Sequence, residues 1–234
     1  MGQTKQDAWH KQWELFKDDE TFLFADWIYP NTLTDFKDKE VLECGCGGGQ
    51  HTAMIAPFAK HITAVDLNTA DLARERNRQY NNISFLNEDI GSMGLSSAFD
   101  IVLSIGVVHH TDDPDKTVEN LKKHLKPGGK LILWVYSKEG NALMRMFIEP
   151  FRRMFLKSAR SGVLTAISRV LTILLYAPVY SIYLLPLKKL PYYEYFQNFR
   201  KLSFQRNLLN VYDKLNAPQT VFIEKTGSMD GLTI

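Results

Sequence analysis

Residues 41–53, VLECGCGGGQHTA, decide how the rest of the chain is interpreted. A short apolar run leads into an unbroken series of cysteines and glycines, residues 44–49, and residues that favour a helix follow. Glycine reaches positive φ angles and, having no Cβ, allows another group to approach the backbone closely. We therefore expect a strand, a tight turn with a ligand lying against it, and then a helix.

Length and charge limit the classes of protein that fit. The chain has 234 residues, of which 45% are hydrophobic, enough for one sizeable core and an attached lobe. Its 28 basic and 26 acidic side chains give a formal net charge of +2. This balance gives no overall electrostatic reason to expect a nucleic-acid partner, so any basic surface must be local.

The cysteines indicate neither a metal site nor a disulfide. Cys44 and Cys46 lie one residue apart, a spacing that fits neither a zinc site nor a disulfide framework. We expect no metal and two reduced thiols. Residues 1–16 carry charges throughout and lack the apolar core of a secretory signal. These features favour a cytoplasmic protein.

The pattern from residue 41 onward alternates between apolar strands and helical segments. We predict helices over residues 50–59, 69–80 and 115–125, and strands over residues 41–45, 61–67, 83–90, 98–110 and 130–136. The strands are continuously apolar rather than alternating, which is typical of a parallel sheet covered on both faces. The expected fold is therefore α/β, with a doubly wound, mainly parallel, Rossmann-like sheet.

Four segments are expected along the chain. Residues 1–34 form an N-terminal helical segment, residues 35–137 the Rossmann-like core, and residues 138–215 a helical, apolar and basic lid insertion. Residues 216–234 hold only two short apolar runs, VFIEK and GLTI. We therefore expect the C-terminal hairpin of such a sheet to be shortened or absent.

The glycine turn falls at the carboxyl end of the first strand, where open α/β sheets bind ligands. The dinucleotide pattern G-x-G-x-x-G fails, because Gln50 stands at its third glycine. A nicotinamide-dependent oxidoreductase is disfavoured for that reason. The pattern that fits is an acidic residue followed by glycines at every second position: Glu43, Gly45, Gly47 and Gly49. A carboxylate here suits a cationic amine and would repel a pyrophosphate.

With this loop, residues 35–136 resemble class I, seven-strand S-adenosylmethionine-dependent methyltransferases of the methyltransferase type 11 group. The resemblance implies S-adenosyl-L-methionine as cofactor and S-adenosyl-L-homocysteine as product. It implies that the methionine end lies on the E-x-G-C-G-x-G loop, here Glu43, Gly45, Cys46, Gly47 and Gly49.

The same resemblance assigns residues after the later strands. It implies that Asp66 holds the ribose hydroxyls with Leu67 against the adenine, and that Asp89 faces the adenine amino group with Ile90 beside it. Ser104 and Ile105 are then expected to line the cofactor near the transferred methyl group. Asp66 alone also fits a helix N-cap and Asp89 an ordinary turn, but their joint order at strand ends favours the cofactor assignment.

Candidate catalytic residues follow the fourth strand. His109 and His110 lie where a neutral imidazole could deprotonate a phenol, an enol or an alcohol. The alternative is that they only hydrogen-bond the loop, since adjacent strand residues point in opposite directions. Tyr136, at the end of the fifth strand, is a candidate for substrate contact. Further along the chain, the resemblance suggests Arg206, Asn210 and Tyr212 as residues that line the acceptor site.

The insertion leaves three interpretations open. Residues 170–187 carry no charge over 18 positions, close to the length of a membrane span, but Pro178 and Pro186 interrupt them. The segment could be a lid over an apolar substrate, a homodimer contact, or a peripheral membrane contact through residues 150–190. In the membrane interpretation, four basic residues face lipid headgroups: Arg152, Arg153, Lys157 and Arg160.

The expected function is methyl transfer to a small-molecule acceptor that is apolar or lipid-like, with O- or C-methylation favoured. The alternative is a cofactor-binding or membrane-peripheral protein of the same fold without turnover. The sequence leaves open the acceptor, the use of a general base, and the extent of the C-terminus.

Overall fold

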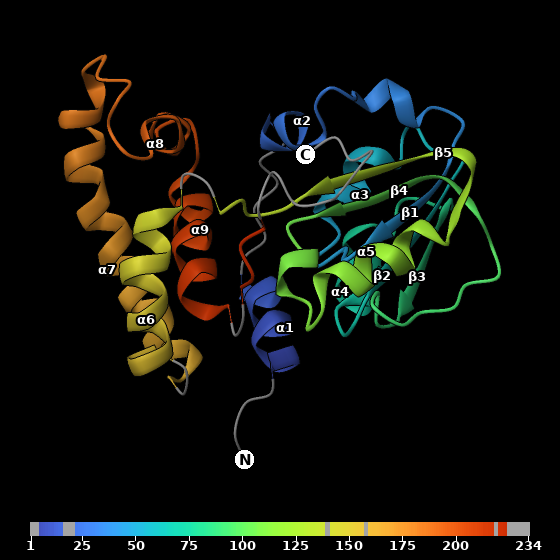
Figure 1. The fold of residues 1–234 in the computed structure, drawn as a ribbon, viewed down its shortest axis with the longest axis horizontal. Coiled ribbons are helices and arrows are strands. Elements are labelled where there is room, and N and C mark those ends of the chain that lie inside the picture. Colours follow the sequence, from blue (N-terminus) through green and yellow to red (C-terminus); the bar gives the residue numbers. More distant parts are fainter. Residues whose placement is uncertain (1–4, 16–21, 139–140, 157–158, 218–219, 224–234) are drawn as a thin grey trace. The chain divides into compact units, whose positions relative to one another are not determined.

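A computed structural model describes residues 5–15, 22–138, 141–156, 159–217 and 220–223. The chain forms two compact units, which are described separately (Figure 1). The helical unit comprises Met1–Glu20 and Lys138–Pro218, and the core unit comprises Thr21–Ser137 and Gln219–Ile234. Residues 1–34 are thus divided between the two units.

The core unit contains a five-stranded parallel sheet in the order β3-β2-β1-β4-β5 (Figure 1). The strands are β1 (Glu40–Cys44), β2 (His61–Asp66), β3 (Ile83–Asn87), β4 (Phe99–Ile105) and β5 (Leu125–Trp134). This arrangement confirms the predicted doubly wound, Rossmann-like sheet. The strand order reverses between β1 and β4, so the turn after β1 lies at the topological switch point.

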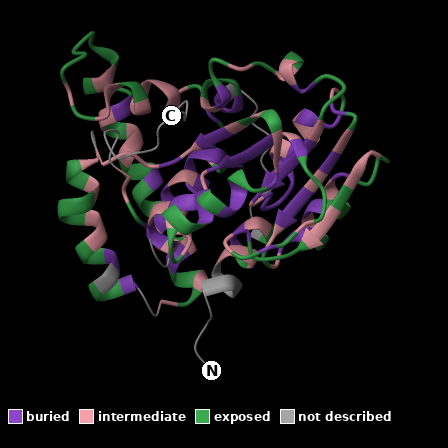
Figure 2. Cartoon of the chain, turned by 45° about the vertical axis from the view of Figure 1, so that its right-hand side comes forward, coloured by how far each residue is buried: buried purple, intermediate pink, exposed green. Residues whose placement is uncertain are grey.

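Buried side chains fill both faces of the sheet. Val41 and Ile101 belong to one hydrophobic cluster, whereas their neighbours Leu42 and Val102 belong to the other. Successive side chains of a strand point to opposite faces, so continuous apolar runs are needed when both faces are covered. Figure 2 shows the resulting concentration of buried residues along the strands. The helical elements of the core unit are α2 (Phe22–Ile28), η1 (Leu33–Phe36), α3 (Gln50–Ile55), α4 (Ala70–Arg76), η2 (Val108–His110) and α5 (Pro114–Lys122).

Several predicted element boundaries were wrong; α4, for example, ends at Arg76 rather than at residue 80. Helix α3 ends at Ile55 rather than at residue 59, just before Pro57, which cannot donate a backbone hydrogen bond. Strand β4 ends at Ile105 rather than at residue 110, because Gly106 has a φ of 77° and turns the chain into a 3₁₀ helix. The predicted turn at KPGG instead lies within β5, as an irregularity around Gly128 in the pairing with β4.

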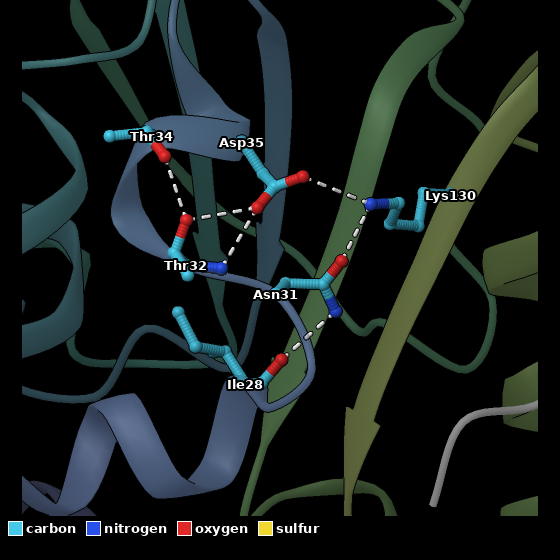
Figure 3. Close-up of polar contacts among 6 residues, drawn as sticks. All are labelled: Ile28, Asn31, Thr32, Thr34, Asp35 and Lys130. Atoms are coloured by element: carbon cyan, nitrogen blue, oxygen red, sulfur yellow. Dashed lines mark hydrogen bonds and ion pairs between the residues drawn. The ribbon is translucent and has the colours of Figure 1, made fainter.

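The segment that leads into β1 is tied to β5 by polar contacts (Figure 3). Lys130 Nζ lies 2.6 Å from Asn31 Oδ1 and 3.3 Å from Asp35 Oδ1. Asp35 also accepts a hydrogen bond from the Thr32 backbone N–H at 2.9 Å, and Asn31 Nδ2 donates to the Ile28 carbonyl at 2.9 Å. Exposed ion pairs contribute little to stability, so these contacts mainly fix the path of the chain.

The helical unit confirms the helical character predicted for the insertion. Its elements are α1 (Lys5–Leu15), the π-helical turns η3 (Met144–Ile148) and η4 (Arg152–Leu156), α6 (Glu149–Phe151), α7 (Ser161–Val179), η5 (Ile182–Leu184), α8 (Tyr193–Phe199) and α9 (Phe204–Asn216). Leu164 of α7 and Tyr212 of α9 belong to one buried cluster. Gln12 Nε2 of α1 donates to Asp213 Oδ1 of α9 at 2.9 Å.

The expectation that the C-terminal hairpin is shortened or absent stays a prediction. Ser137 and Ile223 form a single parallel bridge beyond the end of β5. Residues 224–234 lie outside the described residues.

We predict that Gly49→Ala lowers the free energy of unfolding by about 1–3 kcal/mol. Gly49 has a φ of 77°, and a Cβ there would lie 2.9 Å from the Ala73 Cα of α4, which cannot move aside freely. Urea denaturation of the variant and the parent measures the difference. The control is Gly94→Ala, where a Cβ would meet nothing within 4 Å. Equal effects of the two substitutions would contradict the packing argument.

Candidate functional site

The loop between β1 and α3 is built on three glycines with positive φ angles. Gly45, Gly47 and Gly49 have φ values of 84°, 53° and 77°. A Cβ on Gly45 would collide with the Val107 side chain, which follows β4. The loop is held to β2 because the N–H groups of Gly45 and Cys46 both donate to the Val65 carbonyl, at 2.7 and 3.1 Å. Other residues can adopt this path only with strain.

Asp66, at the end of β2, lies beside this loop. Its Oδ2 accepts a hydrogen bond from the Gly47 N–H at 2.9 Å, and its Oδ1 lies 3.4 Å from the Asn68 N–H. The carboxylate is half-buried and retains lone pairs beyond these contacts. The two features that the sequence singled out, an acidic strand end and a glycine loop, are therefore adjacent. The contact of Asp66 with ribose stays a prediction.

Glu43 lies beneath the loop. Its side chain is 2% exposed, and Thr52 Oγ1 of α3 donates to its Oε2 at 2.5 Å. Burial raises the pKa of Glu43 to about 8; the charge of Asp66 adds to the rise and the Thr52 hydrogen bond opposes it. Glu43 is therefore largely protonated at neutral pH, and its observed contact joins β1 to α3. Its proposed contact with a ligand stays a prediction.

Sequence reasoning missed two residues that hold the loop. Asn77, after α4, is 1% exposed, and its Nδ2 donates to the carbonyls of Gly49 and Ala73, both at 2.9 Å. Thr52, the partner of Glu43, is fully buried. Asparagine is common after helices and threonine is common everywhere, so neither residue carried a usable signal.

The other predicted cofactor residues lie at or near the same edge of the sheet. Asp89 is exposed, and its Oδ1 accepts from the Gly91 N–H at 2.8 Å, as in a turn. Ser104 is fully buried, and its Oγ donates to the Cys44 carbonyl at 2.8 Å, so it joins β4 to β1. Leu67 is 45% exposed, which leaves its side chain open to a ligand.

Three further predicted residues, Ile90, Ile105 and Cys46, are buried around this edge. Ile90 and Ile105 are 6% and 8% exposed and belong to the two clusters on opposite faces of the sheet. Cys44 and Cys46 are free thiols, as expected, and burial raises the pKa of each well above its ordinary value. Among the described residues, no group of three or more His, Cys, Asp or Glu side chains is placed to hold a metal ion.

His109 and His110 do not lie on opposite sides of a strand. Both belong to the 3₁₀ turn η2, and their ring centroids are 4.1 Å apart. His109 is fully buried, and neither of its ring nitrogens has a hydrogen-bond partner within the part of the chain that the structure describes. Burial and the neighbouring His110 hold the pKa of His109 well below its ordinary value. The His109 imidazole is therefore neutral at physiological pH.

The two histidines belong to an aromatic cluster at the carboxyl ends of β4 and β5. The His109 ring lies 4.3 Å from the half-buried Tyr136 ring, which lies 5.4 Å from Trp134. The cluster continues through Trp27 and Phe222, whose centroids are 5.0 Å from Trp134 and 6.4 Å from Tyr136. We refer to these residues as the aromatic cluster: Trp27, His109, His110, Trp134, Tyr136 and Phe222.

The remaining substrate candidates lie on α9 of the helical unit. Tyr212 is fully buried, which raises its pKa, and Arg206 is 9% exposed. Both belong to the inward face of α9. Asn210 is half-buried, and its carbonyl accepts from Lys214 Nζ at 3.1 Å. The structure gives these side chains packing roles, and their contact with substrate stays a prediction.

Several observations show that the loop fits a polar ligand. Its glycines leave the backbone without Cβ atoms, and Asp66 offers a carboxylate beside it. Gln50 Nε2 and Thr69 Oγ1, which flank the loop and the end of β2 in sequence, are buried without a hydrogen-bond partner among the described residues. Buried polar atoms without partners are costly, so a ligand or water that completes them is favoured.

Comparison with known proteins agrees with this geometry. Residues 42–133 match the sequence profile of the family described as "Methyltransferase domain". The chain is 32% identical over 130 residues to a tRNA U34 carboxymethyltransferase of Alteromonas mediterranea, covering 50% of this chain and 39% of that protein. It is 30% identical over 112 residues to a ubiquinone biosynthesis O-methyltransferase of Coxiella burnetii, covering 46% and 48%.

Among solved structures, the chain is similar to the N-methyltransferase NodS from Bradyrhizobium japonicum in complex with S-adenosyl-l-homocysteine. The identity is 25% and the TM-score 0.47, covering 54% of this chain and 72% of that one. The chain spans less than half the length of the curated relatives described above. The similarity to a methyltransferase domain therefore covers residues 42–133, which is less than half of this chain.

We predict that Glu43→Gln changes the pH dependence of stability. The folded chain holds the pKa of Glu43 at about 8, above the value of 4.5 expected when unfolded. Between pH 4.5 and pH 8 the unfolded chain releases the Glu43 proton, whereas the folded chain keeps it. The free energy of unfolding of the parent therefore falls as the pH rises through this range. Glutamine cannot ionise, so the free energy of unfolding of the variant, relative to the parent, should rise from pH 5 to pH 8.

Urea denaturation at pH 5, 6.5 and 8 measures this difference. Any effect of the glutamine amide on packing that does not depend on pH cancels when the differences at the three pH values are compared. Glu75→Gln, at an exposed position of α4, is the matched control and should show no such trend. A difference between Glu43→Gln and the parent that stays the same at all three pH values would contradict the assignment.

Proposed function

We propose that this protein transfers a methyl group from S-adenosylmethionine, bound on the glycine loop, to a small apolar or lipid-like acceptor. The main support for the proposal is the contact between Asp66 and the loop, in which the Asp66 carboxylate accepts a hydrogen bond from the Gly47 N–H at 2.9 Å. O- or C-methylation is favoured over N-methylation. The free, buried thiols suit the cytoplasm, where cysteines stay reduced.

The donor side is assigned to residues at one edge of the sheet. The backbone of residues 45–49 would accept close approach of the methionine end, and Asp66 would accept hydrogen bonds from the ribose hydroxyls. Asp89 would accept from the adenine amino group, and Leu67 would cover the ring. When bound, the cofactor supplies an electrophilic methyl group on a sulfonium. The protein has mainly to align it with the acceptor.

The acceptor side is assigned to the aromatic cluster. Tyr136, Trp134 and His110 are half-buried, and their rings form an apolar wall of the kind that small-molecule sites use. The neutral imidazole of His109 is in the protonation state that can take a proton from a phenol or an enol, and His110 stays a candidate beside it. These features favour an acceptor with a ring and a hydroxyl group. The similarity to a ubiquinone biosynthesis O-methyltransferase supports the same class.

The similarity to a tRNA U34 carboxymethyltransferase raises a second candidate, a nucleic-acid acceptor. The charge of the core unit argues against a nucleic-acid acceptor. Residues 21–137 carry fifteen acidic and eleven basic side chains, so the core unit repels rather than attracts a polyanion. We therefore favour the small-molecule acceptor.

We predict that Asp66→Asn weakens the binding of S-adenosylhomocysteine and S-adenosylmethionine about 10- to 100-fold, because hydrogen bonds to a charged group are lost. Asparagine keeps an oxygen for the Gly47 N–H, so the loop should stay in place. Isothermal titration calorimetry measures the affinities, with Asp71→Asn at an exposed position of α4 as the matched control. Unchanged affinity in Asp66→Asn, or equally tight binding of NADH, would contradict the donor site.

We predict that the acceptor product partitions into organic solvent. The full chain is incubated with [methyl-¹⁴C]S-adenosylmethionine and either octyl gallate, an amphiphilic phenol, or bulk tRNA. Label should pass into the heptane phase with octyl gallate and should be absent from acid-precipitated tRNA. Label on tRNA would favour the nucleic-acid candidate. No label in either, from a sample that binds the donor, would favour the alternative of a protein of this fold without turnover.

A further inference from the structure

Helix α7 of the helical unit carries large apolar side chains on its outward face, and its buried face mixes polar with apolar side chains. Its buried face includes Ser168 and Thr172, which are both fully buried. Its outward face carries Val170, Ile173 and Leu174, which are 56%, 55% and 61% exposed. A helix at a water-exposed surface normally turns its apolar side inward and its polar side outward.

The stretch Met144–Leu156, formed by η3, α6 and η4, also exposes large apolar side chains. Phe147, Met154 and Phe155 are 61%, 74% and 63% exposed. The ion pair between Arg152 and Glu149, at 2.9 Å, is turned inward instead, with side chains only 7% and 14% exposed. Two separate helical stretches therefore place aromatic and aliphatic side chains on the outside.

The inward face of α7 packs against α9 within the helical unit. The outward face of α7 is therefore not needed to form the core of this unit. Thr172 Oγ1 donates to the Ser168 carbonyl at 2.7 Å, and Asn207 Nδ2 of α9 donates to the Tyr176 hydroxyl at 3.2 Å. Leu164 and Val179 pack into the buried cluster that α9 shares. The apolar side chains of this face are therefore covered within the helical unit, whereas Ser168 Oγ is buried without a hydrogen-bond partner among the described residues.

The exposed apolar side chains are concentrated in one part of the chain. Of the nineteen large hydrophobic side chains that are exposed among the described residues, sixteen lie between residues 143 and 187. Exposed positions are frequent along the helices in Figure 2, in contrast to the sheet. We call residues 143–187 the apolar segment. So large an accumulation is typical of a surface that binds a partner or a membrane.

The charge of residues 141–190 indicates which kind of partner the apolar segment binds. Residues 141–190 carry eight basic side chains and one acidic side chain, whereas residues 21–137 are net negative. Arg145, Arg160, Arg169 and Lys188 are exposed. Arg169 lies about 100° around α7 from Val170, at the flank of the outward face. From that position a long basic side chain can reach past an apolar face to an anionic headgroup.

We infer that the apolar segment docks on the surface of a bilayer that contains anionic lipids. The side chains of α7 and of Met144–Leu156 enter the boundary between headgroups and acyl chains, and the flanking basic side chains bind lipid phosphates. This inference is independent of the proposed methyl transfer. It favours one of the three interpretations that the sequence left open.

The docking is interfacial rather than membrane-spanning. Among the described residues, α7 is the one helix long and apolar enough to cross a bilayer by length and composition. However, Arg169 stands at its middle and would lie at the bilayer centre, where a charge is strongly disfavoured. A second copy of the chain is disfavoured as the partner, because a symmetric interface would bring the same basic residues together.

Vesicle flotation of the full chain tests the inference. Vesicles of phosphatidylcholine alone are compared with vesicles of phosphatidylcholine and phosphatidylglycerol at a 4:1 ratio. The protein should float with the anionic vesicles and much less with the neutral ones. Arg169→Gln should weaken binding to anionic vesicles about fivefold. Lys123→Gln, at an exposed position after α5 of the core unit, removes the same charge and should have no effect.

The apolar contribution is tested by Leu174→Ser, with Val221→Ser, an exposed position of the core unit, as its control. Leu174→Ser should reduce flotation at least severalfold, and Val221→Ser should not. Since both side chains are exposed, circular dichroism should show unchanged folding. A protein that stays in the soluble fraction with both kinds of vesicle would overturn the inference. So would a stable dimer that vesicles do not dissociate, or vesicle binding that survives alkaline carbonate extraction, which would indicate a spanning segment.

Discussion

The loop after β1 can be formed only by residues that tolerate positive φ angles, and the carboxyl edge of the sheet depends on that constraint. Gly45, Gly47 and Gly49 carry the chain from β1 into α3 while Val107 approaches from one side and Ala73 from another. Because the loop takes this path, its N–H groups reach Val65 and Asp66 on β2. Strand β1, the glycine loop and Asp66 therefore lie together at the switch point of the sheet.

The electrostatics of this edge follow from the difference in burial between two carboxyl groups. Glu43 is buried and bonded to Thr52, and its raised pKa keeps it largely neutral. Asp66 is half-buried and accepts from the loop, so it can present negative charge to a ligand. A single charged carboxylate suits hydroxyl or amine donors, whereas two charged carboxylates side by side would repel each other.

The parallel sheet and the position of the loop could be predicted from sequence, because continuous apolar runs and the glycines of residues 45–49 indicate them directly. The turn that brings His109 and His110 together could not, because it depends on the backbone of Gly106. The contact of Gln12 with Asp213 joins residues 201 positions apart, a pairing that local patterns do not encode. The exposed apolar face of α7 could not be predicted either, because the sequence shows the composition of this helix but not which side chains pack inward.

We propose that the glycine loop and the ends of β2 and β3 together bind S-adenosylmethionine or its product. Hydrogen–deuterium exchange of the full chain with and without S-adenosylhomocysteine is the most direct test of this binding site. We expect slower exchange in peptides that cover residues 42–55, 62–70 and 86–95, and no such change with NADH. Slower exchange confined to other regions, or equal protection by NADH, would contradict this assignment of the site.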